Sequence, residues 1–70
     1  MTQQAYYGED YPEPGTPVPT GAELIDFRGG KALFVKVARE AQDNSTGRVA
    51  VQGAQGYREF FPGVYGLEIR

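Results

Sequence analysis

The chain has 70 residues, of which 40% are hydrophobic, with seven basic and nine acidic side chains and a net charge of −2. It contains no Cys and no His, which excludes disulfides, the commonest zinc and copper ligands, cysteine nucleophiles and histidine-based triads. One domain with a thin core is the most that this length allows, and such cores usually need a partner. We therefore expect a non-enzymatic protein without cofactor or metal, which is marginally stable alone or oligomeric.

Residues 1–21 are rich in proline and acidic. Four of them are prolines: Pro12, Pro14, Pro17 and Pro19. Three side chains are acidic and none is basic: Glu9, Asp10 and Glu13. Because closely spaced prolines prevent a helix or a central strand, we predict an extended, polyproline-like arm outside the core, with a disordered tail as the alternative. Removing residues 2–19 should then leave the rest folded.

Aromatic residues in this arm indicate a contact surface. Tyr6, Tyr7 and Tyr11 fall within six residues, which favours an arm that becomes ordered on a neighbouring protein. Their rings would be buried against that neighbour while Glu9 and Asp10 face basic groups on it. We therefore predict that these five residues bind a partner.

From residue 22 onward, short apolar stretches are separated by glycines, as in compact all-β domains. Residues 22–28 predict a first strand, with Ile25 and Phe27 on one face. The stretch 32–39 alternates regularly and is the clearest predicted strand, while a short helix over 32–42 is the alternative. We favour the strand because Val35 and Val37 are β-branched and because residues 43–47 suit a hairpin loop.

The remaining segments complete a predicted small β domain over residues 22–70. Residues 48–52 would pair back with Val49 and Val51 pointing inward. Residues 57–61 and 64–70 would form a hairpin around a type II turn at Pro62-Gly63, with Tyr65, Leu67 and Ile69 on its apolar face. The fold class expected is all-β, a small antiparallel barrel or sandwich of four to five short strands with an extended N-terminal arm.

Two further side chains bear on function. Phe60 and Phe61 are adjacent and must face opposite sides of a strand, so one of them is a candidate for a docking patch, and we assign Phe60 to partner binding. Ser45 is the single serine, and in a turn beside Asn44 and Thr46 its hydroxyl is expected to cap backbone amides rather than act as a nucleophile.

In overall style the chain resembles the decoration, cement or neck accessory proteins of tailed-phage virions. The likeness lies in the proline arm, residues 12–19, followed by a glycine-punctuated β body ending in residues 60–67. It implies a structural subunit docked on capsid or neck subunits and located in the virion, or otherwise a soluble protein. The alternatives are a small β-barrel module that binds a peptide or single-stranded nucleic acid, and an enzyme inhibitor.

Charge and hydropathy bear on two further kinds of partner, nucleic acids and membranes. The sequence lacks the basic excess that phosphate binding usually requires, which argues against a nucleic-acid partner. No stretch approaches the 18 or so apolar residues of a membrane span, and the N-terminal residues do not have the pattern of a signal peptide. We therefore expect no membrane partner and no processing.

Overall fold

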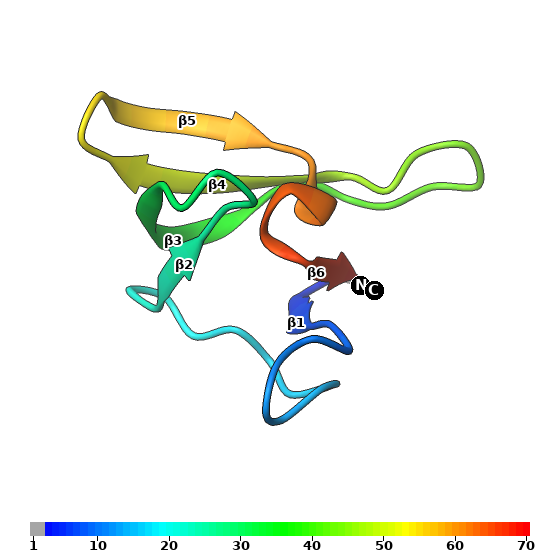
Figure 1. Cartoon of the computed structure of the whole chain (residues 1–70). Helices are drawn as coiled ribbons and strands as arrows, with labels where there is room; N and C mark the ends of the chain where they lie inside the picture. Colours follow the sequence, from blue (N-terminus) through cyan, green and yellow to red (C-terminus); the bar gives the residue numbers. More distant parts are fainter. Residues whose placement is uncertain (1–2) are drawn as a thin grey trace.

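The computed structural model describes residues 3–70, which fold into two antiparallel sheets and one short helical turn (Figure 1). The elements in chain order are β1 (Ala5–Tyr7), β2 (Glu23–Ile25), β3 (Lys31–Arg39), β4 (Arg48–Gly53), β5 (Gly56–Phe60), the 3-10 helix η1 (Pro62–Tyr65) and β6 (Leu67–Ile69). Strands β2, β3, β4 and β5 form one sheet in that order, and β1 pairs with β6. The all-β prediction is therefore confirmed, but the two sheets do not close into a barrel.

The four-stranded sheet is a meander of hairpins. Residues 32–39 lie in β3, so the strand prediction is confirmed and the helical alternative is wrong. The loop between β3 and β4 is closed by a bridge between Gln42 and Ser45, as the hairpin prediction requires, and it projects from the body (Figure 1). A two-residue turn joins β4 to β5, where Gly53 pairs with Gly56.

One face of this sheet, here called the inner face, covers the core. Leu24, Phe34, Val49 and Val51 lie on it and are at most 5% exposed. The prediction that Val49 and Val51 point inward is confirmed. A register shift between Phe34 and Lys36 interrupts the alternation of β3, so that Lys36 and Leu33 share the opposite, outer face.

The N-terminal segment is part of the core, which corrects the expectation of an arm outside it. Ala5 and Val18 are 2% and 7% exposed and belong to the same apolar cluster as Leu24. Strand β1 pairs with β6, with Ala5 opposite Ile69. Proline itself has no N–H to donate, but its neighbour Val18 does, and this amide donates to the carbonyl of Ala5.

Hydrogen bonds also hold the first described residues of this segment. The amide of Gln4 donates to the carbonyl of Arg70, and the amide of Arg70 donates to the carbonyl of Gln4. The side-chain amide of Gln3 donates to the carbonyl of Ala41, and its oxygen accepts from the Ala41 N–H. The first described residues therefore lie beside the last ones (Figure 1).

The predicted hairpin at Pro62-Gly63 is wrong. These residues begin η1, and the left-handed conformation is adopted by Gly66 (φ 69°) and not by Gly63, which a type II turn would require. The chain therefore turns away from β5 and directs β6 toward β1. The predicted apolar face survives this change, because Tyr65, Leu67 and Ile69 are all buried.

Candidate functional site

The three tyrosines of the N-terminal segment lie on the body of the protein and not along an extended arm. The rings of Tyr7 and Tyr11 are 4.8 Å apart between centroids, at an angle of 48°, and both pack against the core. The ring of Tyr6 lies beneath the guanidinium of Arg70, 4.6 Å from its centroid. The structure thus brings two predicted partner-binding residues together and separates the third from them.

Tyr11 is oriented by its hydroxyl, which donates a hydrogen bond to the main-chain carbonyl of Tyr65. Burial raises the pKa of Tyr11 above its ordinary value, with smaller contributions from Tyr7 and Asp10. The phenol is therefore a neutral donor at physiological pH. Its hydroxyl points toward the core, while its ring forms part of the wall of a surface cavity.

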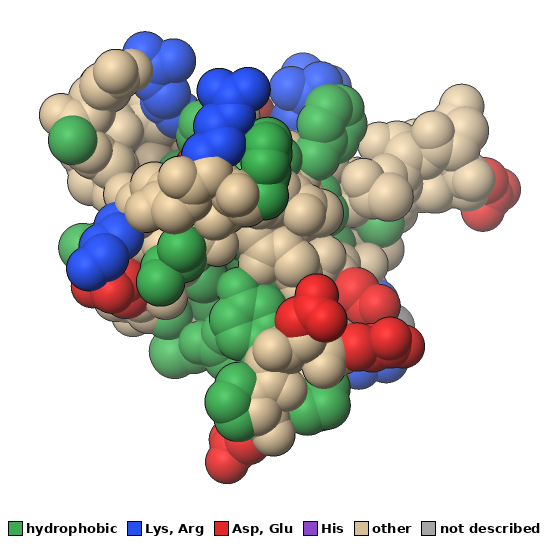
Figure 2. Space-filling model, viewed as in Figure 1, with side chains coloured by type: hydrophobic (Ala, Val, Ile, Leu, Met, Phe, Trp, Pro, Cys, Tyr) green, Lys and Arg blue, Asp and Glu red, His purple; other side chains and the backbone are tan. Residues whose placement is uncertain are grey.

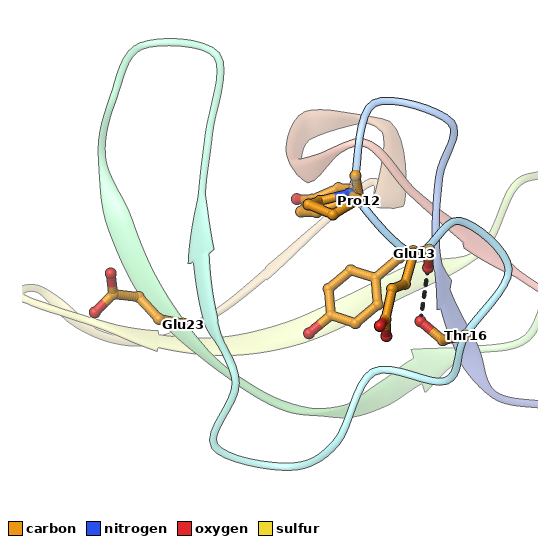
Figure 3. A pocket seen from close by; sticks show the side chains of 6 residues that line it. Pro12, Glu13, Thr16 and Glu23 are labelled. Carbon is orange, nitrogen blue, oxygen red and sulfur yellow. Dashed lines mark hydrogen bonds between the residues drawn. The ribbon is translucent and has the colours of Figure 1, made fainter.

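This cavity has a volume of about 350 Å³ and lies between the N-terminal segment and β2. Its lining consists of Tyr7, Tyr11, Pro12, Glu13, Thr16 and Glu23. Figure 3 shows Pro12, Glu13 and Thr16 on the loop after β1 and Glu23 on β2, with the side chain of Glu23 directed away from the other three. The cavity therefore lies between the loop after β1, which carries Tyr11 and Glu13, and the β2 residue Glu23, and we call it the tyrosine cavity.

The other two predicted acidic residues do not line the tyrosine cavity. Glu9 and Asp10 are exposed in the turn that follows β1. On the face shown in Figure 2, acidic side chains concentrate in the lower half and most Lys and Arg side chains in the upper half. Glu9 and Asp10 are accessible, but the structure gives them no shared site with the tyrosines.

Phe60 and Phe61 divide as expected for adjacent strand residues, but Phe60 is the covered one. Its ring makes an edge-to-face contact with Tyr65, with centroids 5.9 Å apart, and it packs against the core. Phe61 is 51% exposed and lies beneath the guanidinium of Arg48. Of the two residues, Phe61 and not Phe60 is available on the surface.

The outer face of the four-stranded sheet carries most of the exposed large apolar side chains. Ile25, Leu33 and Tyr57 are 52%, 45% and 50% exposed. Leu33 lies opposite Gln52, which in turn lies opposite Tyr57, so Leu33 and Tyr57 project from one face. Ile25 lies opposite Lys31, two residues from Leu33, and projects from the same face. Charged residues surround them: Glu23, Lys31, Lys36 and Glu59.

A fourth exposed apolar side chain, Phe27, is held at the tip of the β2–β3 hairpin and is 77% exposed. The turn is rigid because one carboxylate oxygen of Asp26 accepts hydrogen bonds from the amides of Arg28 and Gly30. A Cβ atom at Gly30 would lie 2.8 Å from the Asp26 carboxylate and would displace that side chain. The aromatic ring is thus exposed on a fixed turn and not on a flexible loop.

Sequence reasoning missed the outer face. It grouped Ile25 with Phe27 on one face of the first strand and did not say which face of the first two strands is exposed. A usable signal was the pair Glu23 and Ile25, because a charged residue two positions from an apolar one on a strand places both on the same, solvated side.

Within residues 3–70, no group of three or more acidic side chains is placed to hold a metal ion. No described helix is long and apolar enough to span a membrane. The hydroxyl oxygen of Ser45 accepts a hydrogen bond from the amide of Gly47, which confirms its predicted capping role.

A comparison of the chain with protein families, curated proteins and solved structures finds no match.

Proposed function

We propose that this chain is a non-enzymatic accessory subunit that docks on a larger protein assembly through the outer face of its four-stranded sheet. The observation that carries the proposal is the group of Ile25, Leu33 and Tyr57 on that face, each about half exposed. Apolar centres with a charged rim are typical of protein interfaces, and Lys36 and Glu59 are part of such a rim.

Phe27 supplies the anchor in this proposal. Interface energy is usually concentrated in a few aromatic or arginine side chains that fill pockets on the partner. The Asp26 hydrogen bonds fix the turn before binding, so little conformational entropy is lost when the ring inserts. The guanidinium of Arg28 lies 5.4 Å from the ring centroid and would accompany it.

A virion is the assembly that we propose, with capsid or neck subunits as the partner. The support is architectural: a small, cysteine-free, all-β body whose low core volume makes docking a source of stability. The mode of docking differs from the initial expectation. Because residues 3–18 pack on their own body, contact with the neighbour is assigned to the sheet face, with Glu9 and Asp10 as accessory contacts.

A nucleic-acid partner gains no support from the placement of the arginines. Tyr57 and Arg58 are adjacent on β5 and project from opposite faces. Arg39 and Arg48 pair with each other where the β3–β4 hairpin enters its loop. Arg58 therefore does not share a face with Tyr57, and Arg48 begins β4 whereas Tyr57 lies opposite Gln52 near the end of that strand.

Site-specific photo-crosslinking tests the proposal. A photoreactive phenylalanine is placed at Leu33 or Tyr57, and a control is placed at Thr46 in the β3–β4 loop. The protein is produced in its native source together with the particles formed there, which are then separated on a density gradient. We expect both outer-face positions to crosslink to one abundant structural protein in the particle fraction, and the control position to give no such product.

A second variant separates docking from folding. Phe27→Ala should leave the free energy of unfolding within about 0.5 kcal/mol of the original, because its ring is exposed, yet remove most particle association. Crosslinks that form equally from position 46, or particle association that survives both Phe27→Ala and Leu33→Glu, would rule out the outer face as the docking surface.

A further inference from the structure

Strand β5 leaves one edge of the four-stranded sheet open. It pairs with β4, and among residues 3–70 no strand lies on its other side (Figure 1). A strand with a single neighbour directs the N–H and C=O groups of every second residue away from the sheet, where another extended chain can bond them. We propose that β5 accepts an extended segment of the docking partner as a fifth strand, an inference that rests on the proposed docking function.

The geometry of β5 suits such an addition. All five of its residues pair with β4 without a register shift, and none of them is a proline. Bulges and prolines are the usual means by which proteins close an exposed edge. The opposite edge of the sheet, β2, has three residues. On β1, Tyr6 already forms a bridge with Pro17. Within the described residues, β5 is therefore the longest regular edge.

A hollow of about 270 Å³ borders the inner side of this edge. Gly56, Arg58 and Phe60 line it, and these are the residues of β5 on the same face as Val51. A Cβ atom at Gly56 would have no neighbour within 4 Å, so the space beside its backbone is open. Because side chains alternate along a strand, every second side chain of an added segment would face this hollow. An apolar side chain opposite Gly56 would fill the open space.

Arg58 favours a different protein over a second copy as the added strand. Two copies of β5 that overlap fully in an antiparallel pair would place Arg58 opposite the same residue of the other copy, and like charges directly opposite destabilise a sheet. An acidic residue at that position of a foreign segment would form an ion pair instead. The proposed segment therefore has an acidic residue opposite Arg58 and an apolar residue two positions away, opposite Gly56.

The docking proposal places such a segment within reach. Tyr57 lies on β5 and projects from the outer face, where it is half exposed beside Leu33 and Gln52. A partner seated on that face would contact β5 itself and lie next to its open edge. Strand addition would join the two contacts into one interface, with main-chain hydrogen bonds adding affinity and the alternate side chains adding specificity.

A titration of the full chain with short peptides tests the edge without the partner. The probe is the acetylated and amidated peptide Thr-Val-Thr-Glu-Thr-Val-Thr, whose glutamate can lie opposite Arg58 with a valine opposite Gly56. In the matched control peptide, lysine replaces the glutamate. Heteronuclear NMR should show saturable shifts at the amides of residues 56–60 with a Kd of about 0.2 to 5 mM, and the lysine peptide should bind about five- to tenfold more weakly.

Two N-methylated forms of the glutamate peptide separate strand pairing from side-chain contact. One is methylated on the backbone nitrogens of its second, fourth and sixth residues, and the other on those of its third and fifth. Only one of these sets of N–H groups can face β5, so one form should lose at least about tenfold in affinity while the other keeps it. Equal affinities of the two forms, or no saturation at about 10 mM of the unmethylated peptide, would overturn the edge site.

A charge reversal locates the binding on the strand. Arg58→Glu should invert the preference, so that the lysine peptide binds more tightly than the glutamate peptide. Lys36→Glu is the matched control, because Lys36 is an exposed basic residue on β3 and away from this edge. An unchanged preference in Arg58→Glu, or the same inversion in Lys36→Glu, would place the peptide elsewhere and overturn the inference.

The two proposals fail in different ways. Crosslinking from positions 33 and 57 with a glutamate peptide that does not bind would leave the docking face in place and remove the edge site. Peptide binding without any crosslink from those positions would remove the docking partner as the source of the strand. A dimer of the free chain that the glutamate peptide dissociates in sedimentation experiments would assign the edge to a second copy, which also overturns the inference. Crosslinking, together with particle association that the glutamate peptide inhibits more strongly than the lysine peptide, supports the inference as stated.

Discussion

The phenolic hydroxyl of Tyr11 donates a hydrogen bond to the backbone carbonyl of Tyr65, which is 54 residues further along the chain. The contact joins the loop after β1 to the 3-10 helix η1. Tyr11→Phe keeps the ring but leaves this carbonyl without its donor. We expect a loss of about 1 to 2 kcal/mol in the free energy of unfolding, measured by urea denaturation. Tyr57→Phe, at a half-exposed position, is the control and should change stability by less than about 0.5 kcal/mol.

Alkaline pH should destabilise the protein. Burial raises the pKa of Tyr11, and burial together with the charge of Asp26 raises the pKa of Tyr65. The folded protein therefore retains two protons that the unfolded chain releases near pH 10. Their contribution to stability is complete below about pH 10 and is lost as the pH rises through the folded-state values.

Urea midpoints measured between about pH 8 and about pH 11.5 should fall steeply at the upper end, and the fall should be smaller in Tyr11→Phe. A midpoint that is constant or rising across this range would contradict the assignment of buried, neutral phenols at these two positions.

Gly8 is required by close packing and not by backbone conformation. A Cβ atom at this position would lie 2.2 Å from the carbonyl oxygen of Gly66, which is a backbone atom that cannot move aside easily. Gly8→Ala should therefore cost about 2 kcal/mol or more in unfolding free energy. Gly63→Ala is the matched control, because nothing lies within 4 Å of its Cβ position and its φ is not positive. Thermal melts measure both variants. Equal melting temperatures for the two would show that the loop after β1 does not approach Gly66.

Leu67 tests the core at the second sheet. It is 4% exposed on β6, so Leu67→Ala should cost about 2 to 4 kcal/mol. Leu33→Ala removes the same atoms from the half-exposed outer face and should cost less than about 1 kcal/mol. Chemical denaturation of both variants gives the comparison, and equal losses would place the two leucines in equivalent surroundings.

Removal of residues 3–18 should unfold the protein. This segment supplies Ala5 and Val18 to the core and the whole of β1 to its sheet. Circular dichroism and a urea titration should show that the truncated chain has lost its cooperative transition. A truncated protein that still unfolds cooperatively, with unchanged stability, would restore the initial picture of an arm attached to an independent body.

The hairpins were predictable because their signals are local. Alternation in residues 32–37, β-branched side chains and the polar loop at 43–47 lie within a few residues of one another, and they identify β3 and β4 without knowledge of the rest. The inward direction of Val49 and Val51 follows from the same alternation. The signal for the two-residue turn between β4 and β5 is also local, because Gly53 and Gly56 flank it.

The N-terminal segment and the C-terminal turn were not predictable in this way, because distant contacts decide them. The proline spacing excludes a helix or a central strand around Val18. The burial of Val18 depends instead on its packing with Ala5 and the rest of the core. Pro62-Gly63 suits a tight turn, yet β6 leaves β5 in order to pair with β1. The tyrosine cavity shares this origin, since Glu23 is separated from the tyrosines in sequence and meets them only in the fold.

The pairing of Ala5 with Ile69 also bears on the order in which the two sheets form during folding. Contacts between β3, β4 and β5 close short loops, whereas the β1–β6 contact closes a loop that contains almost the whole chain and costs the most entropy to form. The meander should therefore assemble early and the β1–β6 pair last. By the same reasoning the backbone amides of Gln4 and Arg70 should exchange their hydrogens with solvent sooner than those of Phe34 and Val51, through an opening that leaves the four-stranded sheet in place.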